Sequence, residues 1–247
     1  MRIRQVVFAS ICGALYATVG MLTYLGIFAP VFGVVRFWPA VIVPGFFTLS
    51  FGPQVGALGA ALGIFISDLL IHGDALLSIT IGVPSNLLGF YLMGVIGRKK
   101  GMRSSLLRLL TALGALASFA LIDYFYFSLV AGSPTVYDIA AALALGLLVS
   151  IPFLWGYFKG DEALLRYALA SNVGLLLGSI YIGTGIWLYS QVLSLPPGVM
   201  GGQSKLPIAA AVFLALWTYS TEIPFLLIVV PPLIRAMPKS LVPGEVT

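Results

Sequence analysis

About eight long apolar segments occupy most of this chain and restrict what it can fold into. They cover approximately residues 6–29, 37–51, 55–71, 78–97, 106–131, 136–158, 163–193 and 207–234. A helix of about 20 apolar residues crosses the hydrocarbon core of a bilayer, where no backbone group can stay unpaired. Because the segments are continuous rather than alternating, they predict helices. We therefore expect an all-α, polytopic membrane bundle of about 6–8 transmembrane helices, forming one domain over residues 1–247.

The small number of charges agrees with this fold class. Only 9% of the residues are charged and 60% are hydrophobic, whereas soluble domains carry about 25% charged residues. This composition excludes an ordinary soluble globule, a disordered chain and a coiled coil. The net charge of +5 is no sign of nucleic-acid binding, because basic residues of membrane proteins gather in particular loops. We expect membrane lipid to surround the chain and nucleic acid to play no part.

The distribution of basic residues predicts the orientation. With an even number of spans, one side of the membrane would hold both termini and eleven basic residues: Arg2, Arg4, Arg98, Lys99, Lys100, Arg103, Arg108, Lys159, Arg166, Arg235 and Lys239. The other side would hold only Arg36 and Lys205. Basic loops remain cytoplasmic, so we expect a multi-pass protein of the cell membrane with both termini in the cytoplasm.

Few residues are suited to catalysis or to holding a metal ion. The chain has one cysteine, Cys12, and one histidine, His72, which leaves no thiolate cluster or His-rich metal site. It has no soluble domain and no Walker-type phosphate loop. We expect no cofactor, no metal and no catalytic residue, and any ATP hydrolysis would belong to a partner.

Small residues form rows on the first predicted helix. Ala9, Gly13 and Ala17 are spaced by four, and Ser10, Ala14 and Thr18 form a second row beside them. Such rows let another helix approach closely in lipid. One interpretation is packing inside the protein, and the other is a docking face for another subunit.

A third cluster of small residues carries a resemblance to a known family. The segment 36–45, RFWPAVIVPG, precedes FGPQVGALGAALG at 51–63 and SDLL at 67–70. Together with the row Ala9, Gly13 and Ala17, these residues resemble the substrate-binding S component of energy-coupling-factor (ECF) transporters. The resemblance covers about residues 1–103, and residues 104–247 would supply further helices. The family usually has six helices and this chain about eight, so either a helical pair has been added after Arg103 or the chain belongs to a different family with a similar first half.

The resemblance implies a function in vitamin or micronutrient uptake. An S component captures its substrate in a pocket open to the outside, and docks through its first helix on a membrane T component that carries two cytoplasmic ATPases. By this resemblance Ala9, Gly13 and Ala17 would dock on the T component.

Two groups of polar residues mark the outer end of the expected bundle. Arg36 and Trp38 precede the second segment, and would either anchor it at the interface or grip a substrate anion with the guanidinium. Asp68 and His72 are four residues apart and share a helix face, close to Asp74. They would form either a capping pair or a pair of hydrogen-bonding groups for substrate.

Further candidates lie inside the expected spans, where ionisable groups are costly and mark functional sites. Asn86 follows Pro84, whose ring frees backbone groups that line binding sites in broken helices. Asp123, with Tyr126 nearby, would either recognise a cationic or heteroaromatic ring or bond to a tyrosine or to Asn172.

The deepest acid is Glu222, in the last segment before Pro224. Trp217 lies about one and a half turns away, too deep for an interfacial aromatic. Glu222 would either contact substrate together with Trp217 or fix this helix to its neighbours.

Two other functional classes compete with a binding subunit. Asp68, Asp123 and Glu222 could serve as proton or sodium sites of a stand-alone secondary transporter, which internal repeats would support. An intramembrane enzyme is a weaker alternative, because no nucleophile, base and orienting group occur in a known motif.

Overall fold

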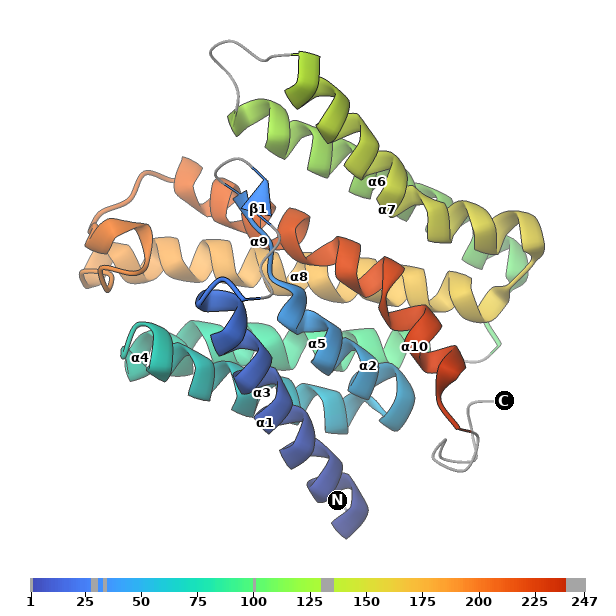
Figure 1. The fold of residues 1–247 in the computed structure, drawn as a ribbon, viewed down its shortest axis with the longest axis horizontal. Helices are drawn as coiled ribbons and strands as arrows, with labels where there is room; N and C mark the ends of the chain where they lie inside the picture. The colour runs from blue at the N-terminus through green and yellow to red at the C-terminus, as the bar shows by residue number, and fades with distance from the viewer. Residues whose placement is uncertain (1, 28–30, 33–34, 100, 130–135, 239–247) are drawn as a thin grey trace.

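The computed structural model describes residues 2–27, 31–32, 35–99, 101–129 and 136–238, apart from the side chains of residues 31–36 and 126–142. These residues form a bundle of antiparallel helices with one very short β-hairpin (Figure 1). The elements are α1 (Ile3–Tyr24), β1 (Val31–Phe32), β2 (Val35–Arg36), η1 (Pro39–Val41), α2 (Ile42–Phe51), α3 (Pro53–Ile71), α4 (Ala75–Leu77), η2 (Ser78–Gly82), α5 (Val83–Gly97), α6 (Ser104–Leu129), α7 (Val136–Lys159), α8 (Glu162–Val192), η3 (Met200–Gly202), α9 (Ala209–Ile228) and α10 (Val230–Ala236).

The expected all-α membrane bundle is confirmed. In the described part of the chain, 6 helices are long and apolar enough to cross a membrane, and two shorter apolar helices cover Pro39–Phe51 and Leu143–Lys159. The second predicted segment is short, as expected. It starts with a turn of 3-10 helix at Pro39 and is followed at once by α3.

The connection between α2 and α3 is a single glycine. Gly52 has φ +114° and ends α2, and Pro53 begins α3. A Cβ on Gly52 would lie 2.7 Å from Nη1 of Arg98 at the end of α5. Glycine is favoured here by the backbone conformation, while the Arg98 side chain is flexible enough to move away from an added Cβ.

Six helical segments form one compact group, which we call the six-helix unit: α1, α2, α3, α4–α5, α8 and α9–α10. All of them except the short α2 are long and apolar enough to cross a membrane. Within it α1 packs on α3, α3 on α5, α5 on α8 and α8 on α9, and α2 lies against α3 and α10. Helices α6 and α7 form a separate pair, the α6–α7 hairpin, which packs on α8 and α9 at the side of this unit (Figure 1).

Small residues create the closest helix contacts of the six-helix unit. Gly59 of α3 faces Cys12 and the carbonyl of Ala9, and a Cβ on Gly59 would lie 3.0 Å from that oxygen. At the α5–α8 crossing, a Cβ on Gly174 would lie 2.6 Å from the carbonyl oxygen of Gly89. Without side chains at these points the two backbones come into direct contact, as is typical of helix pairs in lipid.

Candidate functional site

A partly open cavity of about 240 Å³ lies inside the six-helix unit. Its wall is formed by α1, Trp38 before η1, α3, η2, α5, α8 and α9, with Val199 from the α8–α9 loop. The cavity begins at Asp68 and His72, at the end of α3 opposite the basic loops, and reaches Met93 and Gly174 in the middle of the bundle. Apolar walls with a few polar groups are typical of a small-molecule site.

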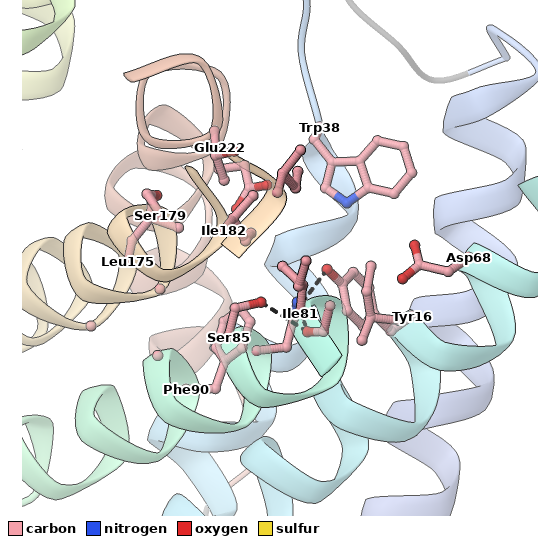
Figure 2. A pocket seen from close by; sticks show the side chains of 18 of the residues that line it. Tyr16, Trp38, Asp68, Ile81, Ser85, Phe90, Leu175, Ser179, Ile182 and Glu222 are labelled. Atoms are coloured by element: carbon pink, nitrogen blue, oxygen red, sulfur yellow. Dashed lines mark hydrogen bonds between the residues drawn. The ribbon is translucent and has the colours of Figure 1, made fainter. Parts of the chain in front are cut away.

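Five of the residues predicted from the sequence border this cavity: Trp38, Asp68, His72, Asn86 and Glu222. They come from the η1 region, α3, α5 and α9, which are widely separated in the sequence. Figure 2 shows Glu222 and Trp38 on one side of the cavity, with Ser85 and Phe90 of α5 on the other. The structure therefore brings residues from both halves of the chain to one site.

A chain of hydrogen bonds fixes the polar groups of the cavity floor. The Tyr16 hydroxyl donates to Oδ1 of Asn86 at 3.2 Å, and Nδ2 of Asn86 donates to the Gly82 carbonyl at 3.0 Å. The Ser85 hydroxyl donates to the same carbonyl at 2.8 Å. Gly82 ends the π-helical turn η2, and a π-turn leaves such carbonyls open to side chains.

Asp68 and His72 lie at the rim. The Ser78 hydroxyl donates to Oδ2 of Asp68 at 2.7 Å, and Nε2 of His72 lies 3.7 Å from Oδ1. The backbone N–H of Asp74 donates to Nδ1 of His72 at 3.1 Å. Since Nδ1 accepts a hydrogen bond, the neutral ring carries its proton on Nε2 and directs it to Asp68.

Asp74, next to the rim, caps the N-terminus of α4. Its Oδ1 accepts the backbone N–H of Leu77 at 2.9 Å, and its Oδ2 accepts the Tyr189 hydroxyl at 3.0 Å. The Leu77 N–H, helped by Tyr189, holds the pKa of Asp74 below its ordinary value, because both bonds favour the ionised carboxylate. This cap ties the α3–α4 turn to the C-terminal end of α8.

Glu222 has a different environment from Asp68. Protein surrounds the carboxyl group of Glu222, and the part of this residue that remains accessible borders the cavity. No described side chain or backbone group forms a hydrogen bond or an ion pair with it. An acid of this kind in low-dielectric surroundings is costly unless it is protonated or paired.

Several predicted residues lie elsewhere. Trp217 packs edge-on against Phe125, with ring centroids 5.7 Å apart, and does not border the cavity. Asp123 is buried on α6 and faces Gly146 of α7, with no hydrogen bond to its Oδ1 from any described group. Neither residue therefore belongs to the cavity. The side chains of Arg36 in β2 and Tyr126 in α6 lie outside the described residues.

The partner that was expected for Asp123 is engaged elsewhere. Nδ2 of Asn172 donates to the Tyr219 hydroxyl at 2.9 Å and to Ser118. The hydroxyl groups of Ser118 and Tyr219 are also bonded, at 2.7 Å. This polar cluster joins α6 to α8 and α9.

The row expected to dock on another subunit lies inside the protein. Ala9, Gly13 and Ala17 are buried against α3, and a Cβ on Gly13 would already lie 3.1 Å from Cβ of Leu62. The exposed small residues of α1 are those of the second row, Ser10, Ala14 and Thr18. The packing interpretation of the first row is the one that the structure supports.

Some cavity residues had not been singled out from the sequence. Tyr16 lies in a helix whose small residues suggested packing or subunit docking, and Ser179 lines the cavity from the middle of α8. Gly89, Gly174 and Gly178 form the α5–α8 crossing beside the cavity. The spacing of Gly174 and Gly178 by four was the available signal, because it predicts a close helix contact.

Neither a metal site nor a known relative helps to assign the cavity. Among the described residues, no three His, Cys, Asp or Glu side chains gather to hold a metal ion. No protein-family model, curated protein or solved structure matches this chain.

Proposed function

We propose that this chain is the substrate-binding S component of an ECF-type importer in the cell membrane. It would capture a vitamin or similar micronutrient from outside, with both termini cytoplasmic. The observation that carries the proposal is the cavity, whose rim at Asp68 and His72 lies at the end of the bundle that has few basic residues. A chain with such a site, no nucleotide-binding motif and no catalytic set is suited to binding rather than to chemistry.

The helix count supports the same proposal. The cavity is bordered only by elements of the six-helix unit, and six helices are the number that the resemblance implies. The α6–α7 hairpin would then be an addition beside an S-component-like unit.

Docking on a T component with two ATPase subunits would use the exposed side of α1. Ser10, Ala14 and Thr18 are exposed there, and the Thr18 hydroxyl donates to the Ala14 carbonyl at 2.8 Å, which leaves a flat stripe of small residues for a partner helix. Ala14→Leu would add bulk to this stripe without entering the α1–α3 contact.

The proposal is tested by reconstitution. The chain, wild type or Ala14→Leu, is co-expressed with a T component and its ATPases, purified through a tag on the chain, and placed in liposomes. We expect the wild type to bring down the partners and to take up substrate only with ATP, and Ala14→Leu to lose the partners. Ile11→Ala, which removes bulk from the same exposed side, serves as the control. Uptake by the chain alone, driven by an ion gradient, would refute the proposal.

One observation favours the alternative of a proton- or sodium-coupled secondary transporter. Glu222 lies in a transmembrane helix, borders the cavity and has no partner among the described groups, as expected of an ion-coupling site. The liposome experiment without partners separates the two functions.

A further inference from the structure

The hydrogen-bonding capacity of the cavity is unequal. The hydroxyl protons of Tyr16 and Ser85 are donated to Asn86 and Gly82, inside the protein. One amide proton of Asn86 is donated to Gly82 as well. Two lining groups lack a partner in the described structure: the Ser179 hydroxyl, which can donate or accept, and the Glu222 carboxylate, which only accepts when ionised.

The charge of the cavity wall has the same bias. Its ionisable groups are Asp68, His72 and Glu222, and no lysine or arginine appears among the described residues that line it. Asp68 is already paired with Ser78 and lies beside His72. Glu222 is thus the one acid with both oxygens available to a ligand.

Aromatic rings stand close to this acid. Trp38 lies next to Glu222 at the top of the cavity and Tyr16 lies below Trp38 (Figure 2). Tyr16 is almost fully buried, at 2% exposure, so its ring is held in one position. The faces of such rings attract cations, most strongly when water is excluded.

We propose, on the basis of the binding function argued above, that the cavity takes a flat ligand with a positively charged nitrogen. The N–H groups of the ligand donate to the Glu222 carboxylate, and its ring or cationic carbon lies against Trp38 and Tyr16. The ligand thereby supplies the counter-charge that no described group provides for Glu222, since a carboxylate buried without one is strongly unfavourable.

Three isosteric probes test the sign of the charge. Benzamidinium, benzamide and benzoate have the same planar size but carry a positive, zero and negative charge. The purified full-length chain is melted in detergent with each probe, and its affinity is taken from the dependence of Tm on probe concentration. We expect benzamidinium to bind at least about tenfold more tightly than benzamide. The reason is that its charged N–H groups form stronger hydrogen bonds to the carboxylate than the neutral amide of benzamide does. Benzoate should not raise Tm.

Two variants locate the effect. Glu222→Gln keeps the shape and removes the charge, and should abolish the preference for benzamidinium while raising the Tm of the free protein. The matched control is Glu162→Gln. Glu162 lies at the N-terminal end of α8 beside Arg166, away from the cavity, and this variant should keep the preference. An unchanged preference in Glu222→Gln, or equal affinity for benzoate, would overturn the proposal, and so would a lack of response to all three probes.

Failure of this inference can be told from failure of the proposed function. If benzoate binds while the reconstituted complex still needs ATP, the chain is an S component with a different substrate class. If benzamidinium binds but uptake proceeds without partners, the inference about the ligand class is supported and the proposed S-component function is refuted. A further comparison is the Tm of the protein in sodium chloride and in choline chloride. If sodium chloride gives the higher Tm, Glu222→Gln removes this difference and benzamidinium has no effect, then Glu222 binds a metal cation and the inference is overturned.

Discussion

The six-helix unit and the α6–α7 hairpin consist of similarly apolar helices, but they pack in different ways. At the α1–α3, α5–α8 and α8–α9 crossings of the unit, glycines meet the backbone of the next helix, as Gly174 meets the carbonyl of Gly89. In the hairpin they meet side chains, as Gly114 meets the rings and amide of Phe153 and Asn172. Backbone contact fixes the distance between two helices, whereas side-chain contact leaves room for adjustment.

The difference bears on where function resides. A cavity keeps its shape only if its walls cannot move together, and the α5–α8 and α1–α3 contacts hold the walls of this one apart. The hairpin contributes no described residue to the cavity. Comparison of the two regions therefore indicates that binding depends on the unit and that the hairpin is peripheral to it.

Excision of the hairpin is the strongest test of this comparison. The Ser104 hydroxyl donates to Oε1 of Glu162 at 2.6 Å, so the two ends of the hairpin are adjacent and a short Gly-Ser linker can join residue 103 to residue 160. We expect a clear fall in Tm, because Phe213 and Trp217 of α9 lose the packing of Phe125 and Tyr219 loses Ser118. Affinity for benzamidinium should stay within about tenfold of the full chain, or about 1.4 kcal/mol.

The control for excision is the full chain with Tyr219→Phe, which breaks the polar cluster but keeps the hairpin. It should lose about 1 kcal/mol of unfolding free energy and keep its affinity. If the excised variant folds but no longer binds the probe, the hairpin shapes the cavity and the comparison is wrong.

A pair of identical substitutions gives a smaller and more specific test. Gly174→Ala places a methyl group 2.6 Å from the Gly89 oxygen and 2.9 Å from Cβ of Met93, and should cost about 1–3 kcal/mol by overpacking. It should also weaken probe binding, because the crossing borders the cavity.

Gly114→Ala is the matched change in the hairpin. Its methyl group would lie 3.6 Å from the nearest atom of Phe153, an ordinary contact, and alanine favours a helix by up to about 1 kcal/mol over glycine. Unfolding of both variants in denaturant measures the difference. Equal destabilisation of the two would show that the unit and the hairpin are packed with the same tolerance.

The sequence predicted the parts of this molecule that depend on one residue or one segment. The helices follow from apolar runs, the α2–α3 turn from Gly52-Pro53, and two of the five cavity residues, Asn86 and Glu222, from the cost of polar groups in lipid. Asp123 was misplaced because that cost says only that a polar side chain is not exposed to lipid. Whether it faces α7 or the cavity depends on how two helices are rotated, which a single sequence does not specify.

The first helix shows the same limit. Two rows of small residues lie side by side on α1, and the sequence does not say which row meets α3. The structure places Gly13 at that contact and leaves Ala14 exposed. Likewise, Tyr16 resembles any buried aromatic until the position of Asn86, seventy residues further on, is known.

The smallest expected effect concerns pH and belongs to the rim of the unit. The pKa of Asp74 is held below its ordinary value by the Leu77 N–H and the Tyr189 hydroxyl. The stabilisation from its ionised form is therefore complete above the unfolded-state pKa of about 3.9 and is lost as the pH falls through the lower folded-state value. Asp74→Asn keeps a capping side chain but not the charge, so its Tm should lie below that of the wild type at pH 6 and approach it near pH 3.

Because Leu77 and Tyr189 both belong to the unit, the variant without the hairpin should show the same dependence of Tm on pH. If excision removed it, the hairpin would control the outer rim, and the two regions would not be independent.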